Sequence, residues 1–263
     1  MVTYLLKKSY RLKNFKEIDF KDLWGDHGVF TTMWIFGKPF KILFFKNHIE
    51  NLIKSIKAYD ISDKKIKKDI LFVIKKNLKT NYKYNHLLRI ALNKNILSFS
   101  LRRRMRPKLD FNLKLINHKR QKPDFKNLKY KKILSYLSKL DNTKSDIGLC
   151  FNKKIFETGT SNLLFIKNNQ IYSPKDKFYK GITYNFFKKK IKKIIHKDIY
   201  VKMINQYDEI ILIGSGKGVA SVKTIKNINW RRKSLKFYKI LLKYYLSEIK
   251  NCPKLNINDY RSK

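Results

Sequence analysis

The chain has 263 residues, of which 43% are hydrophobic and 14% aromatic. This length and composition exclude a disordered protein and allow one large domain or two modest ones with packed cores. Its 62 lysines and arginines against 19 aspartates and glutamates give a formal net charge of +43, which would ordinarily indicate nucleic-acid binding. The lysines are spread along the whole chain, among many Asn, Ile, Phe and Tyr residues typical of AT-rich codons. We therefore interpret the charge as compositional and expect only salt-sensitive, non-specific binding of polyanions.

The sequence also limits the classes of site and location. Cys150 and Cys252 have no neighbours at metal-ligand spacing, so we expect neither a disulfide framework nor a metal site. No run of 18 apolar residues is present, so we expect no membrane-spanning helix. The first residues lack a long apolar core and a cleavage site, which favours a mature cytoplasmic protein.

Hydrophobic periodicity predicts an α+β first part, over residues 1–116. Residues 29–36 and 40–45 read as two strands across a turn at Gly37-Lys38-Pro39. Helical spacing predicts a helix over 48–59 and a second helix that Asp63 caps. A further pair of strands is expected at 87–92 and 96–101.

The polar, basic stretch 117–122, followed by Pro123, is interpreted as a linker to a second part over 123–263. Apolar runs and turn residues in this part predict several short strands and three helices. The strands are expected at 147–151, 163–166, 170–172 and 210–213, and the helices at 130–140, 183–195 and 234–249.

Four motifs in this second part follow one another in order. They are Lys126-Asn127-Leu128-Lys129-Tyr130, Phe156-Glu157-Thr158-Gly159-Thr160-Ser161-Asn162, Gly181-Ile182-Thr183 and Gly214-Ser215-Gly216. Together they resemble the class IV (fold-type IV) pyridoxal-phosphate family, which includes branched-chain and D-amino-acid aminotransferases and 4-amino-4-deoxychorismate lyase. The resemblance implies a two-domain fold, with a small α+β N-terminal domain and a larger, mainly β C-terminal domain. It also implies pyridoxal 5'-phosphate between the domains, usually in a homodimer.

The resemblance assigns a role to each motif. Lys126 would be the catalytic Schiff-base lysine, Tyr130 the donor to the ring hydroxyl of the cofactor, and Glu157 the carboxylate at its pyridine nitrogen. The phosphate would bind at Gly181, Ile182 and Thr183, which open a helix, and at Ser215 and Gly216, which follow a buried strand.

Each of these residues also has an ordinary interpretation. Lys126 is one of many lysines that could lie in solvent, and Tyr130 could be a core aromatic residue. Glu157 could pair with a surface lysine at the edge of a hairpin, and Thr183 could cap its own helix.

The sequence departs from the family pattern on the first helix. Family members usually have His-x-x-Arg-Leu there, whereas this chain has His48-Ile49-Glu50-Asn51-Leu52. Asn51 cannot make the arginine's charge-assisted contact with the phosphate. Either Lys217 or another lysine compensates, or the cofactor dissociates more readily.

Within the family, the residues favour the lyase. Gly28-Val29-Phe30-Thr31-Thr32 is similar to the Phe-Thr-Thr of the lyases, and the chain lacks the Gly-rich segment of branched-chain aminotransferases after the second phosphate loop. We therefore expect a 4-amino-4-deoxychorismate lyase that releases pyruvate and gives 4-aminobenzoate. The alternatives are a branched-chain or D-amino-acid aminotransferase, and a basic nucleic-acid-binding or cofactor-less family member.

Overall fold

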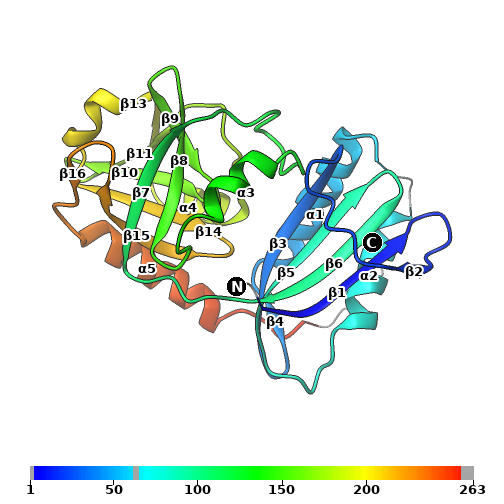
Figure 1. Ribbon diagram of the computed structural model, residues 1–263. Helices are drawn as coiled ribbons and strands as arrows, with labels where there is room; N and C mark the ends of the chain where they lie inside the picture. Colours follow the sequence, from blue (N-terminus) through cyan, green and yellow to red (C-terminus); the bar gives the residue numbers. More distant parts are fainter. Residues whose placement is uncertain (1–2, 62–64, 256–263) are drawn as a thin grey trace. The chain divides into compact units, whose positions relative to one another are not determined.

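The computed structural model describes residues 3–61 and 65–255, and these residues form two compact units (Figure 1). The first unit comprises Met1–Arg104, Phe125–Lys129 and Asn251–Lys263, and the second Met105–Asp124 and Tyr130–Lys250. The mixture of sheets and a few helices confirms the expected α+β class. Among the described residues, no helix is both long and apolar enough to cross a membrane.

The first unit is built on an antiparallel six-stranded sheet. Its strand order is β2-β1-β6-β5-β3-β4, and β3 pairs with β5 along its whole length, from Gly28 opposite Asn93 to Gly37 opposite Tyr84. The strands are β1 (Tyr4–Arg11), β2 (Glu17–Ile18), β3 (Gly28–Gly37), β4 (Lys41–Ile42), β5 (Tyr84–Asn93) and β6 (Ile96–Arg103).

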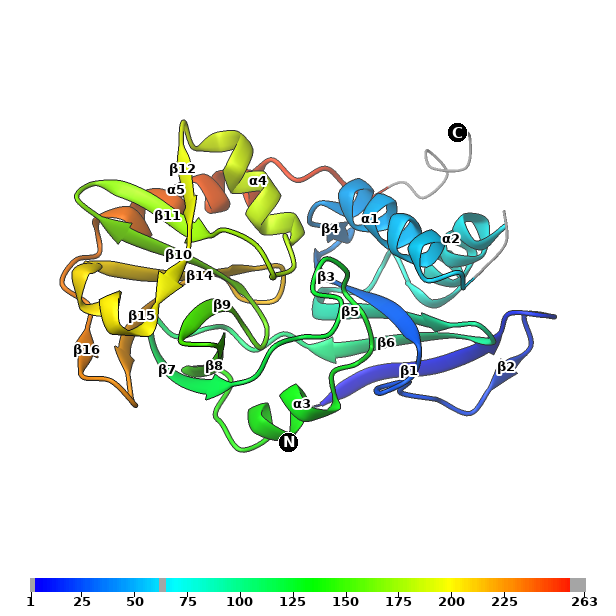
Figure 2. The same ribbon diagram turned by 90° about the horizontal axis from the view of Figure 1, so that it is seen from above.

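Two helices, α1 (Phe45–Ala58) and α2 (Ile66–Asn77), cover one face of this sheet, as Figure 2 shows. Apolar residues of α1 recur at helical spacing, among them Ile49, Leu52 and Ile56, and they are buried together with residues of β3 and β5 in one core. The sheet thereby presents one face to the helices, and this arrangement fixes α1 against β3.

Expectation and structure differ at the start of α1. The predicted strand over 40–45 shrinks to β4, because Phe44 adopts the left-handed backbone conformation (φ 57°) and α1 already begins at Phe45. The expected helix cap, Asp63, lies outside the described residues.

The second unit contains a ten-stranded mixed sheet. Its strand order is β12-β11-β10-β14-β15-β7-β8-β9-β13, with β16 paired to β15. The strands are β7 (Asp110–Asn117), β8 (Ser145–Phe151), β9 (Lys154–Thr158), β10 (Asn162–Lys167), β11 (Gln170–Pro174), β12 (Ile194–Lys197), β13 (Ile199–Tyr200), β14 (Glu209–Gly214), β15 (Gly218–Ile225) and β16 (Trp230–Arg231).

Helices α3 (Lys131–Leu137), α4 (Ile182–Lys190) and α5 (Lys236–Lys250) and the short η1 (Val201–Gln206) complete the unit. All three predicted helices are present, although α3 and α4 are shorter than expected. A core of alternating strand residues lies on one face of the sheet, including Phe111 of β7, Leu163 of β10 and Leu212 of β14. The other side of β15 meets α5, where the ring of Tyr245 lies directly beneath Gly218.

The two units divide the chain at positions other than the expected boundary at residues 117–122. Strand β7 pairs in parallel with both β8 and β15, so it belongs to the second sheet. The segment Phe125–Lys129 belongs to the first unit, because it runs beside β3 through an isolated bridge between Val29 and Asn127. Hydrogen bonding, rather than composition, therefore sets the division.

The N-terminus of α5 depends on one buried carboxylate. Glu209, which is fully buried at the start of β14, accepts hydrogen bonds from the backbone N–H groups of Phe237 and Tyr238 at 2.9 Å each and from the Ser234 hydroxyl at 3.0 Å. These N–H groups lie in the first turn, where a helix leaves its donors without intrahelical partners and where a negative charge is favourable.

Glu209→Gln should therefore lower the free energy of unfolding by about 1–3 kcal/mol, since the amide group removes one acceptor from buried donors. Urea unfolding followed by circular dichroism measures the change. The control is Asp208→Asn next to it, whose exposed pair with Lys233 contributes little. Equal stability of the two variants would contradict the capping role of Glu209.

Candidate active site

The strongest electrostatic feature of the second unit is a buried ion pair between Glu157 and Arg120. Glu157 lies on β9 opposite Leu149 of β8, and Nη1 of Arg120 is 3.2 Å from both carboxylate oxygens. The side chains are 2% and 5% exposed for Arg120 and Glu157, respectively. Burial by itself lowers the pKa of Arg120, but the charge of Glu157 outweighs it and raises that pKa, so the guanidinium stays charged.

Sequence reasoning missed Arg120, which falls in the stretch interpreted as a linker. The usable signal was Glu157 itself, because a carboxylate on a strand surrounded by apolar residues requires a buried cation or several donors. In a chain with so many basic residues, that requirement did not indicate which of them would pair with it.

Tyr130 lies next to this ion pair, at the residue that precedes α3. Its ring centroid is 5.2 Å from the guanidinium carbon of Arg120, and its hydroxyl donates to the carbonyl oxygen of Gly159 at 3.2 Å. Burial raises the pKa of Tyr130 to about 12, against the opposing effect of Arg120. The hydroxyl is therefore protonated at neutral pH, and it must turn away from Gly159 to donate to a bound molecule.

Asn162 joins the segment after Glu157 to the start of α4. Its amide donates to the carbonyl of Tyr179 at 2.5 Å and accepts from the N–H of Gly181 at 3.1 Å. A Cβ atom at Gly181 would lie 2.9 Å from that side-chain oxygen, so the close approach requires glycine.

The first turn of α4 offers donors for an anion. The N–H groups of Ile182 and Thr183 belong to the first turn of the helix, whose donors lack intrahelical partners, and the helix dipole favours negative charge there. Thr183 is 1% exposed, and among the described residues its hydroxyl has no hydrogen-bond partner. A buried hydroxyl of this kind is destabilising unless a ligand or an ordered water pairs with it, and a phosphate group at the start of the helix could do so.

The turn that carries Ser215 and Gly216 connects β14 to β15. At its first end, Gly214 approaches the preceding motif so closely that a Cβ atom would lie 3.2 Å from the Ser161 hydroxyl and 3.3 Å from the Thr160 carbonyl. The second unit therefore brings the candidate phosphate turn against the segment that follows Glu157.

Lys217, in the same turn, forms an ion pair with the buried Asp146. Its Nζ atom is 2.8 Å from Oδ2 of Asp146, and its side chain is only 9% exposed. The positive charge of Lys217 is thus already balanced within the protein, which disfavours its expected role as the substitute for the missing arginine.

Lys126 lies in the first unit, where its main chain is fixed against β3. The carbonyl of Lys126 accepts from the N–H of Phe30 at 2.9 Å, and the N–H of Leu128 donates to the carbonyl of Gly28 at 2.9 Å. The amine of Lys126 is 5.1 Å from the ring centroid of Phe30. The backbone of this segment is therefore held independently of the lysine side chain.

A buried histidine accompanies Lys126. Nδ1 of His48, on α1, is 2.8 Å from the hydroxyl of Thr31, and burial together with the charge of Lys126 lowers the pKa of His48 to about 3. His48 is therefore neutral at physiological pH. Asn51 lies one turn further along α1 and is half-buried, and the looser cofactor binding expected from it stays a prediction.

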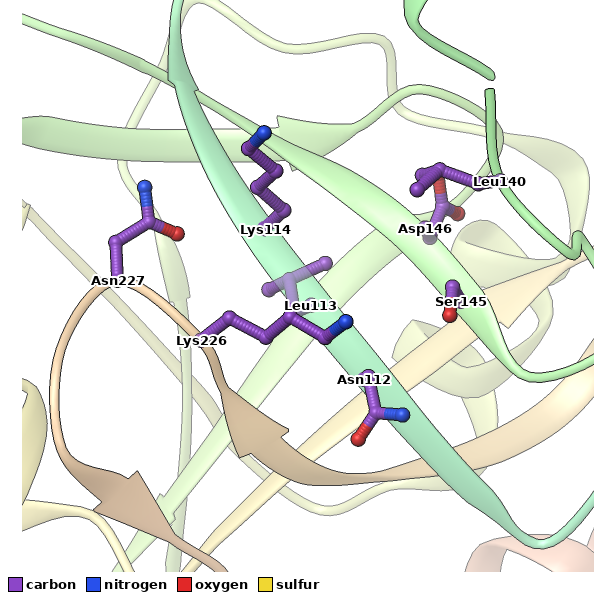
Figure 3. A pocket seen from close by; sticks show the side chains of 8 residues that line it. All are labelled: Asn112, Leu113, Lys114, Leu140, Ser145, Asp146, Lys226 and Asn227. Atoms are coloured by element: carbon purple, nitrogen blue, oxygen red, sulfur yellow. The ribbon is translucent and has the colours of Figure 1, made fainter. Parts of the chain in front are cut away.

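Two other kinds of site, a metal site and a cavity, were compared with the candidate cofactor residues. In the described part of the chain, no group of three or more His, Cys, Asp or Glu side chains could hold a metal ion. A cavity of about 360 Å³ beside β7 and β8 includes Lys114 and Lys226 among its lining residues (Figure 3). Because none of the candidate cofactor residues lines it, we do not assign this cavity to the cofactor.

Comparison with known proteins extends these observations. The sequence model of the amino-transferase class IV family matches residues 28–225. A search of curated proteins gives no match.

Solved structures of this fold are similar over most of the chain. A branched-chain aminotransferase from Thermoproteus uzoniensis has a TM-score of 0.72 at 12% identity and covers 92% of this chain and 95% of its own. A putative 4-amino-4-deoxychorismate lyase from Legionella pneumophila has a TM-score of 0.66 at 20% identity, and the match covers 83% of this chain and 91% of the lyase chain. A pyridoxal-phosphate-bound hypothetical aminotransferase from Mycobacterium tuberculosis has a TM-score of 0.68 at 12% identity, and the match covers 93% of this chain and 99% of the aminotransferase chain. The chain therefore belongs to the class IV aminotransferase family of pyridoxal-phosphate-dependent enzymes.

Proposed function

We propose that the protein is a pyridoxal-phosphate-dependent 4-amino-4-deoxychorismate lyase, which gives pyruvate and 4-aminobenzoate and acts in folate biosynthesis. The observation that carries the cofactor assignment is the buried pair of Glu157 and Arg120. A carboxylate that an adjacent guanidinium keeps ionised is what a protonated pyridine nitrogen requires as its partner.

Other residues of the second unit would supply further contacts to the cofactor. The N–H groups of Ile182 and Thr183, with the Thr183 hydroxyl, would bind the phosphate at the start of α4. Gly181 allows that approach, and Ser215 and Gly216 would provide the second phosphate turn. Tyr130 would turn its hydroxyl from Gly159 toward the ring hydroxyl.

Lys126 would be the catalytic lysine, which bonds the cofactor covalently and later moves a proton. His48 beside it is neutral, so the amine has no imidazolium charge from this residue next to it. The hydrogen bonds of the Lys126 and Leu128 backbone hold the main chain of this segment against β3.

When bound, pyridoxal phosphate withdraws electrons from a substrate carbon that loses its proton. Lys126 would accept that proton from the amine-bearing ring carbon of the substrate. Loss of the enolpyruvyl group as pyruvate leaves an aromatic ring, so elimination is strongly favoured. Glu157 would keep the pyridine nitrogen of the cofactor protonated, and Arg120 fixes Glu157 through their ion pair.

The choice of lyase over transaminase depends on the residues of β3. The sequence Phe30-Thr31-Thr32 follows the lyase pattern, and Thr31 is hydrogen-bonded to His48 next to Lys126. The same catalytic residues would serve a branched-chain or D-amino-acid aminotransferase, in which Lys126 returns the proton to the cofactor carbon. We also propose that the enzyme is a homodimer, as family resemblance implies.

Pyruvate release from 4-amino-4-deoxychorismate, measured beside transamination of leucine and D-alanine, tests the proposed reaction. We expect pyruvate and 4-aminobenzoate in equal amounts and little keto acid from either amino acid. Faster transamination of leucine or D-alanine would assign the protein to the aminotransferases instead.

Lys126→Ala should abolish turnover and the yellow colour of lysine-bound pyridoxal phosphate, because the nucleophile and the proton carrier are lost together. The fold should survive, since the carbonyl of residue 126 keeps its hydrogen bond from the N–H of Phe30 in the variant. Absorbance and activity are compared with Lys131→Ala, an exposed lysine at the start of α3. Full activity in Lys126→Ala would remove the residue from the mechanism.

Glu157→Gln should retain the cofactor but lose roughly 10²-fold or more in rate, since a neutral amide no longer keeps the pyridine nitrogen protonated. It should also lower the melting temperature, because Arg120 is left buried without its counter-charge. Steady-state rates measured at saturating cofactor show the loss of catalysis separately from the loss of stability. Glu17→Gln, in an exposed ion pair, is the control, and a near wild-type rate in Glu157→Gln would place the role elsewhere.

A further inference from the structure

Asp146 is a fully buried carboxylate that ties three segments of the second unit together. Its Oδ2 atom accepts from the hydroxyls of Thr158 and Thr160 at 2.9 and 2.7 Å and from Nζ of Lys217 at 2.8 Å. Lys217 also donates to the Thr160 hydroxyl at 2.5 Å, which closes a triangle of polar groups. The three donors come from the end of β9, the loop after it and the turn between β14 and β15.

These segments are the ones that carry the proposed cofactor contacts. Thr158 follows Glu157 directly, Thr160 lies in the loop that leads to Asn162, and Lys217 follows Ser215 and Gly216. A buried charge pair with additional hydrogen bonds resists displacement, because either ion without its partner would be left uncompensated in a dry environment.

The turn is also confined at both of its ends. Gly214 lies against Thr160 and Ser161, and Gly218, at φ 75°, lies over the ring of Tyr245. Between these two contacts, the ammonium group of Lys217 lies 2.8 Å from the buried carboxylate of Asp146. The Lys217–Asp146 pair therefore connects this turn to β8.

We propose, on the basis of the proposed function, that Lys217 and Asp146 form a positioning pair. The pair holds the second phosphate turn, Ser215 and Gly216, in register with the segment that carries Glu157. Lys217 then acts on the cofactor through the turn and does not contact the phosphate. Binding depends on the ion pair as a unit: loss of either partner loosens both segments.

The alternative is that Lys217 leaves Asp146 and binds the phosphate directly. The two roles differ in the expected effect of Asp146→Asn. A direct ligand would be released by this substitution and would bind the phosphate as well or better. A positioning pair would be broken, and binding would weaken as it does in Lys217→Met.

The experiment compares wild type, Lys217→Met, Asp146→Asn, the double variant and a control, Lys223→Met. Lys223 lies on β15 and pairs with Asp110 at the surface, so its removal should have little effect. Affinity is measured by titrating the apo-protein with pyridoxal 5'-phosphate, and local order by amide hydrogen exchange of peptides covering 158–162 and 214–218 without cofactor.

Each single variant should weaken pyridoxal-phosphate binding by about fivefold or more and speed exchange in both segments. The double variant should have about the same affinity and exchange rates as either single variant, because each single substitution already removes the whole ion pair. Asn is nearly isosteric with Asp, so Asp146→Asn alone distinguishes the positioning pair from a direct phosphate ligand if Lys217→Met does not fold.

Two results would overturn the proposal: unchanged or tighter cofactor binding in Asp146→Asn, or unchanged exchange of 158–162 in both single variants. If the wild type binds no pyridoxal phosphate, the proposed function fails, while the exchange data still decide whether the pair positions the two segments.

Discussion

The burial of Glu157 is the constraint on which the candidate site depends. A carboxylate on an interior strand is tolerated only with a matched cation, and Arg120 supplies it through a guanidinium nitrogen that reaches both oxygens. Arg120 lies between β7 and the segment Phe125–Lys129 of the first unit, so the chain that follows β7 must pass close to β9. The same guanidinium then faces the ring of Tyr130, so that one interaction places two of the proposed cofactor contacts.

A second buried carboxylate, Asp146, organises the other end of the same region. It binds the loop after Glu157 and the turn that carries Ser215, while Asn162 connects that loop to the first turn of α4. The proposed phosphate site is thus built from helix and turn donors together with hydroxyl groups. Within the second unit, the basic side chains of Arg120 and Lys217 are each paired with a buried carboxylate.

Much of this organisation was predictable because the chemistry requires particular residues in order. Lys126, Glu157 and Gly181-Ile182-Thr183 could be proposed from the sequence, and the family assignment that they implied is confirmed by the match over residues 28–225. The helices α1 and α5 and the strands β3, β5 and β14 were also predicted, since their apolar residues recur with a clear period.

The rest depends on partners distant in sequence. Strand β7 was missed, although Phe111, Leu113 and Leu115 alternate inward, because the asparagine and lysine between them resemble the residues of the surrounding linkers. Arg120 and Asp146 were missed because a single basic or acidic residue cannot be identified as part of a buried ion pair until the fold shows its burial and its partner. Lys217 shows the converse, since its position in the turn indicated a phosphate contact and the buried Asp146 nearby gives it another partner.

The central claim is that this chain is a pyridoxal-phosphate enzyme that holds its cofactor on Lys126. The most direct measurement is borohydride reduction of the reconstituted wild-type protein, followed by digestion and mass spectrometry of every lysine-containing peptide. The account predicts a phosphopyridoxyl group on Lys126 at close to one per chain and on no other lysine. Attachment to Lys217 or another lysine, or no specific attachment at all, would contradict it.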